Sequence, residues 1–161
     1  MDFAEKEGER NRCLKRAYSR LSRGDLTSRG MLSFLTEKNS RREAFSVETA
    51  KSVVTELKEK GFLDDKRYLR LVLRRADEKL LGPRKIREEL VKLKFPPAYI
   101  EAALSRERDE TARAASLLKR EGKDGLAREL EGKKKAIDFL VRKGYDYSTA
   151  IAAAERFSVL E

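Results

Sequence analysis

The sequence predicts an all-helical protein built from tandem repeats of about fifty residues. Hydrophobic residues recur at helical spacings along the chain, and no stretch shows the period-two alternation that predicts a half-buried strand. Only three of the 161 residues are proline and nine are glycine, which permits helices of several turns. The same arrangement of apolar residues returns at a fixed interval, and this repetition defines the predicted architecture.

The repeat is marked by three aromatic residues, Phe45, Phe95 and Tyr145, which lie fifty residues apart. Apolar residues follow each aromatic at offsets of five, eight and nine, which lie on one face of a helix. These residues are Ala50, Val53 and Val54, then Ile100, Ala103 and Leu104, then Ala150, Ala153 and Ala154. Upstream, the matching pairs are Gly82 and Gly132, Ile86 and Ala136, Leu90 and Leu140, and Val91 and Val141, with Met31 and Leu35 as looser partners in the first unit.

We therefore expect three tandem three-helix repeats, against the alternative that helices of similar length align by coincidence. The repeats are assigned to residues 10–61, 62–107 and 108–161. Each has about fifty residues and a thin core, so burial within one repeat barely offsets its chain entropy. Repeats of this size that contact only their neighbours form an elongated, curved array. No long apolar heptad seam is present, which favours a monomer.

The helices of the first repeat are predicted from their caps. They cover about 10–22, 28–37 and 47–60. Thr27 and Ser46 are suitable N-caps for the second and third of these helices. Gly61 suits the left-handed position that follows the end of the third.

The second repeat is bounded by acidic residues and prolines. Its helices cover about 64–80, 83–94 and 97–105. Asp64 or Asp65 caps the first helix, and Gly82 stops it before Pro83 opens the next. Pro96 and Pro97 then end the second helix and open the third.

The sequence GKDG interrupts the third repeat, so its middle helix has two possible starts. Its helices are expected over about 109–120, then 126–143 with an alternative start at Lys133, then 146–157. The alternative start applies if Gly132 acts as a stop in the way that Gly82 does. Residues 146–148 supply the cap of the last helix.

Composition excludes several classes of function. The chain has no histidine, which rules out a Ser-His-Asp triad and histidine-ligated zinc. One cysteine, Cys13, supports neither a disulfide framework nor a cysteine-rich metal site. The pair Asp64 and Asp65 is explained by helix capping, and GKDG lacks the spacing of a phosphate-binding P-loop. We therefore expect no enzymatic activity, no metal and no cofactor. No signal peptide or membrane span is expected, so the predicted location is the cytoplasm.

Basic residues are the candidate binding groups. The chain has 38 basic and 28 acidic residues, and residues 10–42 hold ten basic residues against two acidic ones, a net charge of +8. Clusters of this kind neutralise phosphates or meet acidic protein surfaces, although most charged helix faces are only solvated. The candidates for contact with DNA or a protein partner are Arg16, Arg20, Arg23, Arg70, Arg74, Arg75, Arg84, Lys85 and Arg87. The last five are expected to be exposed and replaceable at little cost in stability.

The stretch GFLDDKRYLRLVLRRADEKLLGPRKIREELVKLKF resembles the RecX family of recombination regulators. The resembling pattern is Gly61, an apolar pair, two aspartates, an Arg-Tyr pair, a basic helix, Gly82-Pro83, and Glu89-Leu90 before a basic and aromatic end. LSRGDLTSRGMLSFLTEK resembles the first unit of that family and AIDFLVRKGYDYSTAIAAA its third, so the resemblance covers residues 11–157. The family usually has glycine before the second aromatic, whereas this chain has Lys94, and before the first it has Ala44.

The resemblance implies a modulator of RecA. Members of the family bind the RecA nucleoprotein filament, lie along its helical groove, and restrain ATP hydrolysis, strand exchange and filament growth. The implied role is regulation of DNA repair and recombination, including the SOS response, with the RecA filament and single- or double-stranded DNA as partners.

Two other functions remain open from the residues. One is an independent helical DNA-binding module or transcription regulator, although the chain has no glutamine and only Asn11 and Asn39 for base readout besides arginine. The other is a helical scaffold for a protein partner. Aromatic residues make up only 7% of the chain, which argues against a stacking platform for single strands.

Overall fold

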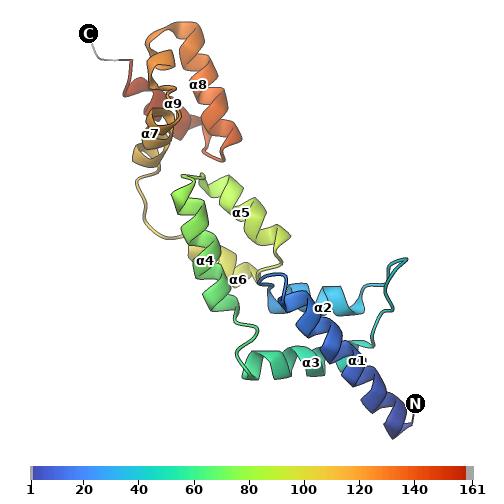
Figure 1. Ribbon diagram of the computed structural model, residues 1–161. Coiled ribbons are helices and arrows are strands. Elements are labelled where there is room, and N and C mark those ends of the chain that lie inside the picture. The colour runs from blue at the N-terminus through green and yellow to red at the C-terminus, as the bar shows by residue number, and fades with distance from the viewer. Residues whose placement is uncertain (1, 159–161) are drawn as a thin grey trace. The chain divides into compact units, whose positions relative to one another are not determined.

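The computed structural model describes residues 2–158, and within them the chain is all-helical, as the sequence predicts (Figure 1). The described range contains no strand; the pairing between Asn39 and Arg42 is an isolated bridge in a loop. The helices are α1 (Phe3–Leu21), α2 (Ser28–Thr36), α3 (Val47–Glu59), α4 (Asp65–Glu78), α5 (Pro83–Lys92), α6 (Pro97–Leu104), α7 (Glu110–Arg120), the 3-10 helix η1 (Asp124–Arg128), α8 (Leu130–Arg142) and α9 (Tyr147–Glu155).

The chain forms two compact units. Unit 1 holds the residues up to Leu71 together with Leu93–Pro96, and unit 2 holds Val72–Lys92 and the residues from Pro97 onward. The boundary between the units therefore falls within α4. The two units differ from the three predicted repeats in both number and boundaries. The division into repeats over 10–61, 62–107 and 108–161 stays a prediction.

Most of the predicted caps form. The side chains of Thr27, Ser46 and Asp146 accept hydrogen bonds from the third residue beyond them, at the starts of α2, α3 and α9. Asp64 does the same for α4, where its Oδ1 accepts from the amide of Arg67 at 3.0 Å. Gly61 adopts the predicted left-handed conformation, with φ of +77° after α3.

The start of the first helix was predicted wrongly. α1 begins at Phe3 and not near residue 10, because Asp2 and Glu5 form a capping box. The Asp2 side chain accepts from the amide of Phe3 at 2.7 Å, and Glu5 accepts from the amide of Asp2 at 3.1 Å. The added turns are mostly polar and exposed, so they lack the apolar periodicity on which the prediction relied.

Neither predicted start of the eighth helix is correct. Residues 124–128 form η1, and α8 begins at Leu130. Gly132 lies in the first turn of α8, where a Cβ atom would lie 2.0 Å from the carbonyl oxygen of Leu126. This glycine therefore allows η1 to pack closely against α8 and does not end a helix.

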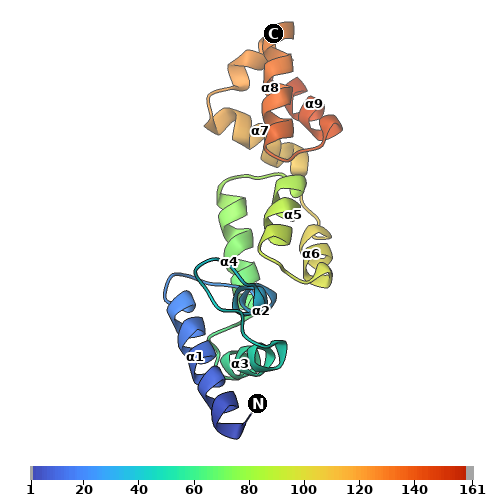
Figure 2. The same cartoon turned by 90° about the vertical axis from the view of Figure 1, so that its right-hand side faces the viewer.

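The core of unit 1 lies among α1, α2 and α3. Buried apolar side chains from all three helices form one cluster with Phe45 and Leu63; the helical members are Cys13, Ala17, Met31, Leu35, Ala50, Val53, Val54 and Leu57. In unit 2, a cluster of buried apolar side chains lies among α7, η1, α8 and α9 (Figure 2). Its bulkiest members are Leu117, Leu118, Leu140 and Tyr145.

The three aromatics of the predicted repeat occupy similar local settings. Phe45, Phe95 and Tyr145 are exposed by only 3%, 2% and 1%, and each lies two residues before a helix. The residues at offsets five and eight are buried in every case, whereas at offset nine Leu104 is only half-buried. These placements support the repeat prediction.

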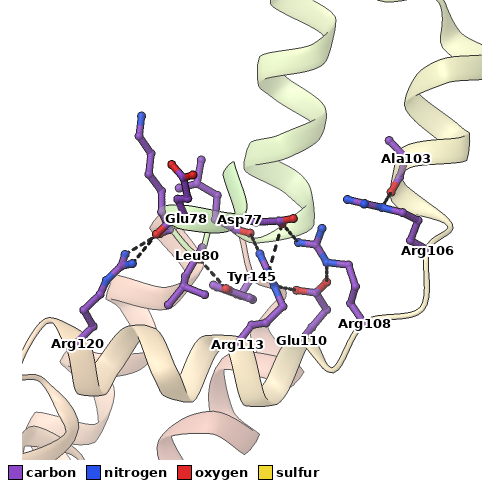
Figure 3. Close-up of polar contacts among 12 residues, drawn as sticks. Asp77, Glu78, Leu80, Ala103, Arg106, Arg108, Glu110, Arg113, Arg120 and Tyr145 are labelled. Carbon is purple, nitrogen blue, oxygen red and sulfur yellow. Dashed lines mark hydrogen bonds and ion pairs between the residues drawn. The ribbon is translucent and has the colours of Figure 1, made fainter. Parts of the chain in front are cut away.

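Within unit 2, the end of α4 is fixed by groups from the third predicted repeat (Figure 3). A helix leaves its last carbonyls without helical partners. Arg120 donates to the carbonyls of Glu78 and Lys79, at 2.6 and 2.9 Å. The Tyr145 hydroxyl donates to Leu80 at 2.6 Å, and Arg113 donates to Leu81 at 3.0 Å. Four successive carbonyls are thereby satisfied.

Just after the end of α4, two backbone segments approach each other closely. We call this contact, together with the bonds to the last carbonyls of α4, the joint of unit 2. The amide of Gly82 donates to the carbonyl of Lys143 at 2.9 Å, and the amide of Arg84 donates to the carbonyl of Gly144 at 3.0 Å. A Cβ atom on Gly82 would lie 2.3 Å from the carbonyl carbon of Gly144. Because backbone atoms cannot turn aside as a side chain does, this position excludes every residue except glycine.

A related joint lies inside unit 1. The N-cap of α2, Thr27, donates from its hydroxyl to the carbonyl of Leu93 at 2.6 Å. Leu93 lies fifty residues before Lys143, and each is followed by a left-handed residue: Lys94 with φ of +61° and Gly144 with φ of +98°. In unit 1 the start of α2 therefore bonds to the turn before Phe95. In unit 2 the start of α5 bonds in the same way to the turn before Tyr145.

We expect Gly82→Ala to lower the free energy of unfolding by about 2 kcal/mol or more, because the new methyl group would displace the backbone at Gly144. The matched control is Gly125→Ala, where nothing lies within 4 Å of an added Cβ. Urea unfolding of both variants followed by circular dichroism measures the difference. Equal stability of the two variants would contradict the close approach.

The buried carboxylate of Glu9 provides a pH-dependent prediction. It accepts from the amide and hydroxyl of Ser46 at 2.9 and 3.1 Å and from the hydroxyl of Thr49 at 2.7 Å, and these bonds lower its pKa, the Ser46 amide most strongly. A lowered pKa gives stability that is present above the ordinary value of 4.5 and is lost as the pH falls through the lowered value. Glu9→Gln is expected to reduce thermal stability at pH 7, with a difference from the original chain that shrinks as the pH falls below 4.5.

The control for this titration is Glu7→Gln, at an exposed position of the same helix. It removes one negative charge without removing a buried acceptor. A Glu9→Gln difference that stays constant between pH 7 and the acid limb, or that Glu7→Gln reproduces, would contradict the role of the Glu9 carboxylate.

Candidate nucleic-acid interface

The structure brings three of the predicted arginines together in unit 1. Arg16, Arg20 and Arg23 line one hollow of about 470 Å³ at the C-terminal end of α1. The other residues that line it are Ser19, Phe34 and Arg42. The hollow thus has four guanidinium groups and no carboxylate among its lining residues.

Arg42 was not among the predicted binding residues. It comes from the loop between α2 and α3, and the pairing of its backbone with Asn39 closes a tight turn. The Asn39 side chain accepts from the amide of Arg41 at 2.9 Å, which fixes the turn further. The Arg42 guanidinium then lies over the ring of Phe34, 4.4 Å from its centre. Only the doublet Arg41-Arg42 in a polar loop could have suggested this role from the sequence.

Arg16 has a structural role in the same place. Its guanidinium lies 4.3 Å from the centre of the Phe45 ring, and one of its amino groups donates to the carbonyl of Glu43 at 2.5 Å. Among residues 2–158, the Arg20 side chain makes one long bond, to the carbonyl of Gly24 at 3.4 Å, and Arg23 is exposed. The donors of Arg20 and Arg23 therefore remain largely available to a bound anion.

The predicted arginines of α4 are exposed. The side chains of Arg70, Arg74 and Arg75 make no hydrogen bond or ion pair within the part of the chain that the structure describes. They are spaced by four and one residues along the helix. Arg70 also contributes to the lowered pKa of the Asp64 carboxyl through its charge.

Of the basic residues of α5, Arg84 and Arg87 are exposed as predicted and Lys85 is half-buried, but all three have partners within unit 2. Arg84 donates to the carbonyl of Val141, and Lys85 is half-buried and pairs with Glu88 at 3.2 Å. Arg87 forms two hydrogen bonds with Glu101, at 2.6 and 3.3 Å, which lower the pKa of the Glu101 carboxyl. These side chains hold elements of unit 2 together, so replacing them is expected to affect stability as well as binding.

A second group of arginines, which the sequence analysis did not single out, is internal to unit 2. Arg108 pairs with Asp77 and Glu110 at 2.9 and 3.2 Å, and Arg113 pairs with the same two carboxylates at 3.3 and 3.4 Å (Figure 3). Both arginines are largely buried, at 16% and 17% side-chain exposure. This cluster is neutral in total and belongs to the joint at the end of α4.

The described residues show neither a metal-binding cluster nor an activated cysteine. Among residues 2–158 no three histidine, cysteine or acidic side chains gather in a way that could hold a metal ion. Burial raises the pKa of the Cys13 thiol to about 11, so it is protonated at neutral pH and is a poor nucleophile. The helices between residues 2 and 158 include none that is long and apolar enough to span a membrane.

The fold and the exposed arginines define a class: an all-helical, strongly basic protein. Comparison with known proteins gives the family. The chain is 33% identical over 113 residues to the regulatory protein RecX of Xanthomonas axonopodis pv. citri (strain 306), covering 70% of this chain and 69% of the relative. It is 33% identical over 127 residues to the regulatory protein RecX of Xanthomonas campestris pv. campestris (strain B100), covering 76% and 77%. The chain belongs to the RecX family of regulatory proteins.

A further relative and a solved structure agree. The regulatory protein RecX of Stenotrophomonas maltophilia (strain K279a) is 32% identical over 111 residues, covering 68% of each chain. A crystal structure of a regulatory protein RecX matches 94% of this chain and 74% of its own with a TM-score of 0.68. At 19% identity this match shows the fold alone. No protein-family model matches the sequence.

Two sets of variants separate structural from available arginines. Arg113→Ala is expected to lower the free energy of unfolding by about 2 kcal/mol or more, because it leaves Asp77 and the Leu81 carbonyl with fewer partners. The double variant Arg74→Ala and Arg75→Ala is expected to change it by at most about 0.5 kcal/mol per site. Urea unfolding measures both. A loss from the double variant as large as that from Arg113→Ala would contradict the assignment.

Proposed function

We propose that this protein binds the RecA nucleoprotein filament and restrains RecA-dependent ATP hydrolysis, strand exchange and filament growth, and so regulates recombination and the SOS response in the cytoplasm. Membership of the RecX family, over at least two thirds of the chain, carries this proposal. A regulator of this kind needs no catalytic apparatus. The protein acts as a monomer.

The arginine-lined hollow of unit 1 and the exposed arginines of α4 support a DNA contact within this function. The guanidinium groups that line the hollow attract phosphate, and their charge does not depend on pH in the physiological range. Arg84, Lys85 and Arg87 are secondary contributors, because intramolecular partners already engage them. The available candidates are therefore Arg20, Arg23, Arg42 and Arg70 in unit 1, and Arg74 and Arg75 in unit 2.

An independent DNA-binding module is the second candidate, favoured by the same hollow. It would bind DNA without RecA and would inhibit RecA only by covering the strand. The side-chain amide of Asn39 is engaged in its own turn, which weakens a role in reading bases. This candidate therefore predicts sequence-independent binding.

A titration of the RecA ATPase distinguishes the two functions. At fixed RecA and fixed single-stranded DNA, the protein is expected to inhibit at concentrations well below those that saturate the DNA. The reason is geometric, since one molecule on a filament affects many RecA subunits, whereas a competitor must cover the strand. An unrelated basic protein of similar net charge is the control. Inhibition only at DNA-saturating ratios, equal to that of the control, would favour the independent module.

A further inference from the structure

We propose that the hollow lined by Arg16, Arg20, Arg23 and Arg42 is a phosphodiester-binding site, which engages the nucleic-acid backbone without reading its bases. The inference deepens the proposed DNA contact by naming the site and the ligand group. Its test uses no RecA, so its failure and the failure of the proposed RecA function are separate outcomes.

The hollow has no counter-ion among the residues that line it. The residues that line the hollow include no carboxylate. The nearest acidic residue along the loop, Glu43, pairs with Arg12 at 3.8 Å. Four guanidinium groups around one concavity repel one another unless an anion is bound, and this chain pairs its buried arginines with acids elsewhere. The missing negative charge therefore comes from a ligand.

Two of the arginines that line the hollow are partly ordered before any ligand binds. Arg20 and Arg42 are half-buried, which limits their side-chain motion before binding, and Arg23 at the rim is exposed. Arg42 is held by its stacking on Phe34 and by the closed turn at Asn39. A guanidinium fork matches two oxygens of one phosphate group, so partly ordered forks bind phosphate at a reduced entropy cost.

The lining of the hollow offers few groups that could recognise nucleic-acid bases. Phe34 is the only aromatic residue among those that line the hollow, and the Arg42 guanidinium covers one face of its ring. Ser19 is the only uncharged polar side chain in the lining. The hollow therefore lacks both a free stacking platform and a set of donors and acceptors for base edges. Its volume of about 470 Å³ accommodates a sugar and its phosphates.

The test is fluorescence anisotropy of a labelled oligothymidylate of about 12 nucleotides with the full chain at low salt. The triple variant Arg20→Ala, Arg23→Ala and Arg42→Ala leaves Arg16 in place, because that residue also supports Phe45. We expect its affinity to fall at least about tenfold, and the dependence of affinity on salt to become shallower by about two units of slope, since each lost contact removes about 0.7. The matched control loses the same charge at exposed positions of the same unit: Lys51→Ala, Lys58→Ala and Lys66→Ala.

Two further arms identify the ligand group. An abasic deoxyribose-phosphate chain of equal length is expected to compete nearly as well as the oligothymidylate, whereas inorganic phosphate and a polyglutamate peptide compete weakly. The variant Arg20→Lys, Arg23→Lys and Arg42→Lys keeps the charge but loses the forks, and it is expected to bind at least about threefold more weakly than the original chain.

Several results would overturn the proposal. One is equal loss of affinity in the arginine and lysine triple variants. Another is polyglutamate competing as well as the abasic chain, which would make the hollow a general acidic-peptide site. Failure of the abasic chain to compete would assign binding to the bases. Thermal unfolding of each variant ensures that only folded proteins are compared.

Discussion

The constraint on which both units depend is a backbone carbonyl in the turn two residues before a buried aromatic. In unit 1 the carbonyl of Leu93 accepts from Thr27, and in unit 2 the carbonyl of Lys143 accepts from Gly82. In the first predicted repeat the equivalent carbonyl, of Glu43, accepts from Arg16. The Arg16 side chain thus makes the hydrogen bond that a group at the start of a helix makes in the other two turns. This bond explains why Arg16, unlike Arg20 and Arg23, is not free to bind a ligand with all its donors.

Steric demands at these turns differ between the units. In unit 2 the approach is so close that Gly82 and Gly144 both lack room for a side chain. In unit 1 a hydroxyl bridges the gap, and the left-handed position carries Lys94 where the RecX resemblance leads one to expect glycine. A non-glycine residue in this conformation costs about 1 kcal/mol, and Lys94 is also paired with Glu37 at 3.4 Å. The departure from the family pattern is therefore tolerated without loss of the joint.

The sequence was sufficient for the helices whose signals are local. Thr27, Ser46, Asp64 and Gly61 act within a few residues of their own positions, so a capping preference predicts them correctly. The start of α1 was missed because a polar, exposed turn has no apolar periodicity. The role of Gly132 was misjudged because its constraint comes from Leu126 in a tertiary contact, which spacing alone does not reveal.

The candidate site divides in the same way. Arg16, Arg20 and Arg23 share one helix end, so their grouping follows from helical spacing, but Arg42 reaches them only through the turn at Asn39. The partners of Arg84 and Arg87 also lie outside the local sequence, in α8 and α6. Charge could be counted from the sequence, yet only the fold separates arginines committed to structure from those available to a ligand.

Co-sedimentation with RecA tests the central claim most directly. RecA filaments assembled on single-stranded DNA are pelleted with the protein, beside RecA alone and DNA alone, at a salt concentration that abolishes binding to bare DNA. The account predicts that the protein pellets with the filament at a saturable ratio below one molecule per RecA subunit. Recovery with the filament no greater than with bare DNA under these conditions would contradict it.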